Sequence, residues 1–144
     1  MLKQKFKYED SAVAKDVFKE GDYAFTFDLK SAYHHVEIFE QHRQYLGFYW
    51  IFDGQVRYLV FNVLPFGIST AGYVFTKLTR VPVAYWRSQG EKVVMFLDDG
   101  IAGCSDIGQA IKMSKSIRSD LNDLGFLLAD EKCEWEPKQD VTWL

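Results

Sequence analysis

Cysteines, prolines and long apolar runs are scarce in this chain of 144 residues. The two cysteines, Cys104 and Cys133, have neither the spacing of a metal site nor that of a disulfide framework. No window approaches 18 uncharged apolar residues, so no membrane-spanning helix is expected. The basic N-terminus lacks the apolar segment of a secretory signal. We therefore expect an intracellular protein, not attached to a membrane, with reduced thiols.

An excess of basic charge is also absent, because 17 Lys and Arg residues stand against 20 Asp and Glu residues, for a net charge of −3. This balance argues against a free-standing nucleic-acid binder that relies on a basic face. Hydrophobic residues make up 48% of the chain and aromatic residues 17%. A chain of this length and composition is expected to fold as one domain with a core that contains β-structure.

Residues 92–103 are the stretch around which the chain is organised. An apolar run, the acids Asp98 and Asp99 with Gly100, and a second apolar run predict a β-hairpin with the acids at its turn. Two adjacent carboxylates repel each other, so they persist most readily beside a bound cation. Taken alone, however, an Asp-Asp-Gly turn is more often a solvated hairpin tip.

The remaining pattern alternates strands with amphipathic helices. Asp53-Gly54 between two aromatic runs is typical of a hairpin. Pro82 lies inside a helical pattern and is expected to kink or interrupt it. Helices are predicted at 8–20, 69–88 and 106–124, and strands at 23–29, 44–51, 55–61, 126–129 and 141–144.

Asp28 and Asp98 each lie at the C-terminal end of a predicted strand. If the two strands are neighbours in one antiparallel or mixed sheet, Asp28, Asp98 and Asp99 can converge on a single point. Such a carboxylate cluster suits two Mg²⁺ ions about 3.5–4 Å apart, as in enzymes of phosphoryl transfer.

Four segments, at 27–34, 64–69, 96–99 and 125–132, occur in an order and spacing that resemble the successive motifs of reverse transcriptases from retrotransposons and retroviruses. Within that family the chain is most similar to LTR-type or DIRS-type enzymes. The resemblance implies an α+β polymerase palm, with an antiparallel sheet packed on one face by two to three helices. The Asp53-Gly54 hairpin is then expected to project toward the fingers.

The resemblance also implies a metal site and a proton donor. Asp28, Asp98, Asp99 and the carbonyl of Leu29 match the ligands of two Mg²⁺ ions, for which Mn²⁺ is a possible substitute. Phe96 stands where many members have Tyr, which keeps a ring and removes a hydroxyl. Lys132 matches a lysine proposed to protonate the pyrophosphate leaving group. A surface lysine in a charged loop is an equally good interpretation of Lys132.

A nucleotide site is implied in the same way. Tyr33 matches the bulky side chain that collides with a ribose 2′-hydroxyl, and Phe66 matches a position near the incoming nucleotide. Without the resemblance, Tyr33 would be interpreted as a core aromatic residue. The neighbouring residues expected to contribute to nucleotide binding are Ser31, Ala32 and Gly67. His34 and His35 have no metal-ligand partner at a recognisable spacing, so a structural role is expected for both.

The implied function is that of an RNA-directed DNA polymerase, whose partners are an RNA or DNA template, a DNA or RNA primer and dNTPs. Tyr33 disfavours an RNA-synthesising relative. The alternative is a domesticated or decayed palm that serves as a structural or interaction module. Residues 1–144 are expected to form one palm with part of the fingers, truncated at both ends, without thumb or RNase H. We therefore expect the chain to be inactive or weak without the missing regions of its parent polyprotein.

Overall fold

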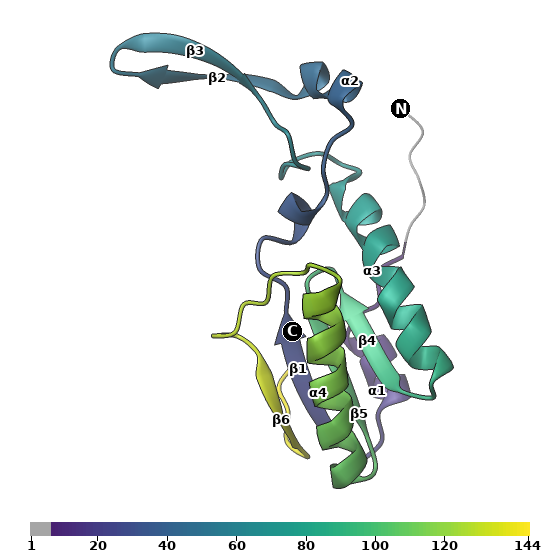
Figure 1. The fold of residues 1–144 in the computed structure, drawn as a ribbon. Coiled ribbons are helices and arrows are strands. Elements are labelled where there is room, and N and C mark those ends of the chain that lie inside the picture. Colours follow the sequence, from purple (N-terminus) through teal and green to yellow (C-terminus); the bar gives the residue numbers. More distant parts are fainter. Residues whose placement is uncertain (1–6) are drawn as a thin grey trace.

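The computed structural model describes residues 7–144, which adopt an α+β fold built on a four-stranded antiparallel sheet (Figure 1). The strands lie in the order β4–β5–β1–β6. Their bounds are Tyr23–Asp28 for β1, Lys92–Phe96 for β4, Asp99–Cys104 for β5 and Glu134–Lys138 for β6. The predicted first strand and the predicted hairpin at 92–103 are both confirmed.

Two long helices cover one face of this sheet, and a short helix covers the other. Helices α3 (Ala71–Ser88) and α4 (Ile107–Asp123) pack on the first face, and α1 (Ser11–Val17) packs on the second. Asp10 and Asp106 accept hydrogen bonds from main-chain N–H groups in the first turns of α1 and α4. The three predicted helices are therefore confirmed, with bounds that differ by one to three residues at most ends.

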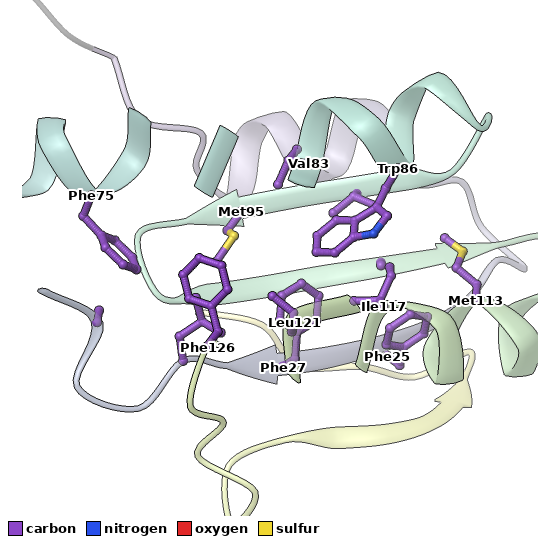
Figure 2. Packing of buried hydrophobic residues seen from close by; sticks show 14 residues of the cluster. Phe25, Phe27, Phe75, Val83, Trp86, Met95, Met113, Ile117, Leu121 and Phe126 are labelled. Carbon is purple, nitrogen blue, oxygen red and sulfur yellow. The ribbon is translucent and has the colours of Figure 1, made fainter. Parts of the chain in front are cut away.

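The alternation of side chains along the strands separates two cores. Phe25 and Phe27 of β1 point toward α3 and α4, where they meet Trp86 and Ile117 (Figure 2). Ala24, the residue before Phe25, points to the opposite face and packs in the cluster that α1 covers. Because successive side chains of a strand point to opposite faces, β1 is packed on both sides. Such burial holds the end of β1, and therefore Asp28, in a fixed position.

A second, two-stranded sheet projects away from the palm (Figure 1). Its strands, β2 (Gly47–Phe52) and β3 (Gln55–Val60), are joined by Asp53 and Gly54, both with positive φ, as the sequence predicts. Every residue of both strands is exposed. The short helices η1 (Ala32–His35), α2 (Glu40–Arg43) and η2 (Gln44–Leu46) connect β1 to this hairpin.

The C-terminal part of the sequence was interpreted wrongly. The segments 126–129 and 141–144 are not strands; the first contains one isolated bridge, between Leu128 and Leu29. The last strand is β6, whose residues Glu134 to Lys138 pair with the far edge of β1. The charged residues and Pro137 of β6 do not form the apolar pattern from which strands are predicted. An edge strand needs neither such a pattern nor a complete set of N–H donors.

The expected interruption at Pro82 is also wrong, since α3 runs continuously through it. The Pro82 side chain is buried beside Val83, and Trp86 packs in the core one turn later. Apolar burial along this face offsets the hydrogen bond that the proline cannot donate. No helix within residues 7–144 is both long enough and apolar enough to cross a membrane.

Candidate active site

The pairing of β1 with β5 places two acidic residues side by side. Asp28, the last residue of β1, lies directly opposite Asp99, the first residue of β5. Two positions along the same ladder, Thr26 lies opposite Ile101, which packs in the cluster under α1. Because alternate residues share a face, Asp28 and Asp99 lie on the α1 side of the sheet, beyond the end of that cluster.

The third acid lies in the turn before β5. Leu97 and Asp98 connect β4 to β5, and Leu97 has a φ of 55°, which is unusual for a residue other than glycine. The carbonyl of Asp98 accepts a hydrogen bond from the N–H of Leu29 at 3.0 Å. The turn is therefore fastened to the residue that follows Asp28, which brings Asp98 to the same end of the sheet as Asp28 and Asp99. The strand that precedes Asp98 is not a neighbour of β1, because β5 lies between β4 and β1.

The electrostatics show how closely the carboxyl groups approach. Burial, a hydrogen bond shared with Asp28 and the charges of Asp28 and Asp98 together raise the pKa of Asp99 to about 6. Burial and the Asp28 charge also raise the pKa of Asp98. Both shifts have the same consequence: without a counter-ion the folded protein resists full ionisation of this cluster.

Lys132 contributes a basic side chain beside the cluster. Its Nζ lies 3.6 Å from Oδ2 of Asp28, and its side chain is 64% exposed, whereas that of Asp28 is 10% exposed. The Lys132 charge opposes the upward pKa shifts of Asp98 and Asp99. Because the ammonium group is largely in water, solvent screens this long ion pair, and the group can reach other partners.

The donor set suits a hard divalent cation, since carboxylate and carbonyl oxygens are the ligands that Mg²⁺ prefers. Within residues 7–144, however, no three acidic, histidine or cysteine side chains are close enough to share one metal ion. The geometry thus gives a close pair, Asp28 with Asp99, and a third acid, Asp98, near it. Metal ligation by these residues and by Leu29 stays a prediction.

The main chain of Asp28 is held by a residue that sequence reasoning did not place at the site. The N–H of Asp28 donates to Sγ of Cys133 at 3.3 Å, and the Cys133 thiol faces the Asp28 carbonyl at 3.7 Å. The N–H of Ala129 donates to the same carbonyl at 2.9 Å. No local signal reveals these contacts, because Cys133 lies more than 100 residues along the chain from Asp28.

The predicted nucleotide residues Tyr33 and Phe66 are in contact. Their ring centroids are 5.0 Å apart, and Tyr33 also meets Phe75 of α3 edge-on at 5.8 Å. Burial, followed by the charges of Tyr8 and Asp98, raises the pKa of Tyr33. Phe66 is 69% exposed, as expected for a ring that packs on a ligand.

The other residues predicted to bind the nucleotide differ in exposure and in the groups that a ligand could contact. Ser31 is exposed and has a φ of 55°, so the chain turns sharply between β1 and η1. The methyl group of Ala32 is buried in the core, which leaves only its main chain for a ligand. Gly67 has a φ of 89°, which favours glycine at this turn. Their roles in nucleotide binding stay predictions.

Comparison with known protein families gives a match. Residues 4–144, nearly the whole chain, match the family model described as reverse transcriptase (RNA-dependent DNA polymerase). No curated protein matches the chain. The match agrees with the family that the four sequence motifs indicate, and it does not separate the LTR type from the DIRS type.

Proposed function

The chain belongs to the reverse transcriptase family, and on that premise we propose that it adds deoxynucleotides to the 3′-hydroxyl of a primer, directed by an RNA or DNA template. The observation that carries this proposal is the register of β1 and β5, which sets Asp28 opposite Asp99 with Asp98 in the adjacent turn. The raised pKa values of Asp98 and Asp99 support it, because a cation would relieve the repulsion that causes them.

The three carboxylates, with the Leu29 carbonyl, would hold two Mg²⁺ ions. When bound, such ions lower the pKa of an attacking hydroxyl and neutralise charge on a triphosphate. With a pKa of about 6, Asp99 is mostly ionised at neutral pH and can act as a ligand even before a cation arrives. This contribution of the protein is electrostatic: it fixes negative oxygens at the end of a rigid strand.

The side chains around the cluster would handle the nucleotide. Lys132 would donate a proton to the departing pyrophosphate, since its ammonium group already lies beside the cluster. Tyr33 would exclude a ribose 2′-hydroxyl, and Phe66 would pack on sugar or base. Base pairing with the template supplies sequence specificity, so the protein needs to grip only backbone and shape. Residues 1–144 would form a single palm unit, with the β2–β3 hairpin as its fingers portion.

Primer extension on poly(rA)·oligo(dT) tests this proposal. We expect the chain to incorporate labelled dTTP slowly with Mg²⁺ or Mn²⁺, and Asp99→Asn to lower incorporation by about a hundredfold or more. Asp123→Asn is the control, because Asp123 is an exposed acid at the C-terminal end of α4, which covers the face of the sheet opposite to that of Asp28 and Asp99. Each metal should also raise the unfolding temperature of the wild type and of the control, but not that of Asp99→Asn.

A folded chain that incorporates no dTTP and gains no stability from either metal would overturn the proposal. That result would favour the alternative, a palm that serves as a structural or interaction module. Equal incorporation by the wild type and Asp99→Asn would place the chemistry elsewhere.

A further inference from the structure

The main chain of Leu127 forms two hydrogen bonds with the segment that follows β1. Its carbonyl accepts a hydrogen bond from the N–H of Lys30 at 2.8 Å. Its N–H donates to Nε2 of His35, also at 2.8 Å. The Leu127 side chain is 60% exposed, so main-chain bonds and not apolar packing of that side chain join the two segments.

These bonds determine which nitrogen of His35 carries the proton. Nε2 must hold a free lone pair to accept from the Leu127 N–H. The proton is therefore on Nδ1, which lies 3.1 Å from the carbonyl of Ala32 and donates to it. The ring also packs on Phe126, with centroids 5.4 Å apart. Both ring nitrogens and one ring face thus have partners.

The His35 ring lies against uncharged surroundings. It lines a cavity of about 270 Å³. The other lining residues, which come from α3 and from the loop after α4, carry no charge: they are Leu78, Val81, Pro82, Leu124, Gly125 and Phe126. A proton on Nε2 would remove the acceptor for the Leu127 N–H.

The segment that His35 fastens is short and begins at a residue in an unfavourable conformation. Helix η1 is four residues long, and Ser31 before it adopts the left-handed conformation, which is unfavourable for a residue other than glycine. The imidazole spans this turn, with Nδ1 bonded to Ala32 at its start and Nε2 bonded to Leu127 outside it. In the sequence, Tyr33 lies between Ala32 and His35, and its ring contacts Phe66 and Phe75.

We propose that His35, as its Nδ1–H tautomer, is a positioning residue that fastens η1 to the loop after α4 and thereby fixes the Tyr33 ring against Phe66 and Phe75. When both hydrogen bonds of His35 are formed, Tyr33 is held in place and discriminates against ribonucleotides. The discrimination rests on the proposed function. The hydrogen bonds and their effect on the position of Tyr33 do not depend on it.

Two substitutions distinguish the role of the hydrogen bond between His35 and Leu127 from that of the hydrogen bond between His35 and Ala32. Gln places an amide oxygen near the position of Nε2 and can still accept from Leu127, whereas the shorter Asn reaches only the position of Nδ1. We expect ¹⁵N shifts of wild-type His35 to show an unprotonated Nε2. In His35→Asn the Leu127 amide should exchange about five- to tenfold faster, and the Tyr33 ring signals should shift. Both should stay near wild type in His35→Gln.

An Nε2–H tautomer in the wild type would overturn the inference. So would unchanged Tyr33 signals in a folded His35→Asn protein. His42→Asn is the matched control, because His42 lies at the base of the hairpin, where its ring contacts Phe39 and Tyr45. It should leave the Leu127 exchange and the Tyr33 signals unchanged.

The selectivity step is measured as the ratio of kcat/KM for dTTP to that for UTP on poly(rA)·oligo(dT). We expect His35→Asn to lower this ratio about fivefold, chiefly through a lower KM for UTP, and His35→Gln to restore it. An unchanged ratio in His35→Asn would overturn the selectivity step. If the wild type uses neither nucleotide, the proposed function fails, and the tautomer and the Tyr33 signals still decide the positioning role.

Discussion

Asp22 is a buried carboxylate that joins the chain before β1 to the start of β4. Its Oδ2 accepts hydrogen bonds from the Lys19 N–H at 2.8 Å and from Nζ of Lys92 at 2.5 Å. Burial alone would raise the pKa of Asp22, but these two bonds and the charges of Lys92 and Lys19 outweigh it and hold the pKa below its usual range. The ionised form is therefore favoured in the folded state.

A depressed folded-state pKa stabilises the protein above the unfolded-state pKa, about 3.9, and the contribution is lost as the pH falls through the lower folded-state value. We expect Asp22→Asn to lower the free energy of unfolding by about 2 kcal/mol at pH 7. The difference from wild type should shrink below pH 4. Urea unfolding at pH 7 and pH 3 measures it, with the exposed Asp16→Asn as control. A difference that does not depend on pH would contradict this assignment.

The ring of Phe27 leaves no space for a side chain at Gly100. Gly100 pairs with Phe27 of β1, and a Cβ at Gly100 would overlap that ring. Phe27 cannot yield, because it stacks on Trp135 at 5.8 Å and meets Trp86 edge-on at 6.3 Å. We expect Gly100→Ala to destabilise the protein by about 2 kcal/mol. Gly47→Ala is the control, since a Cβ there meets only ordinary contacts at 3.7 Å or more. Thermal unfolding that is equal for both variants would show that Phe27 can move aside.

At the scale of elements, two antiparallel ladders can be compared directly. The β1–β5 and β2–β3 ladders each contain six residue pairs. The first is buried between helices, whereas every residue of the second is exposed. A lone two-stranded hairpin is only marginally stable. We therefore expect amides of β2–β3 to exchange at least about a hundredfold faster than those of β1–β5 in native-state hydrogen exchange. Equal protection would mean that the hairpin is covered in solution.

The elements that were predicted correctly are those with a local signal. The Asp53-Gly54 turn, the apolar period of α4 and the capping residue Asp106 are each visible within a few residues of sequence. β6 was missed because it takes its stability from β1, through Trp135, and not from its own composition. The same limit applies to the site. The three acids were predicted from motif order, but the contacts of Cys133 and His35 depend on tertiary packing.

For the whole molecule, Trp135 shows whether the C-terminal segment belongs to the palm. It packs on Phe25 and Phe27, and its carbonyl accepts a hydrogen bond from the Ser114 hydroxyl of α4 at 2.6 Å. We expect Trp135→Ala to lower the free energy of unfolding by about 3 kcal/mol. Trp50→Ala, which removes the same side chain from the exposed hairpin, should change it by about 0.5 kcal/mol or less. Similar losses in both variants would contradict the packing described for β6.

The central position of β1 has a consequence for biosynthesis. β1 leaves the ribosome before either of its neighbours exists, since β5 ends at residue 104 and β6 at residue 138. A nascent chain therefore carries β1 with both edges open, and loops of this length close slowly. Asp28 can lie beside Asp99 only after β5 has emerged. The other edge of β1 pairs with β6, which is translated near the end of these 144 residues. The residues that begin the site are made early, and the site itself forms late.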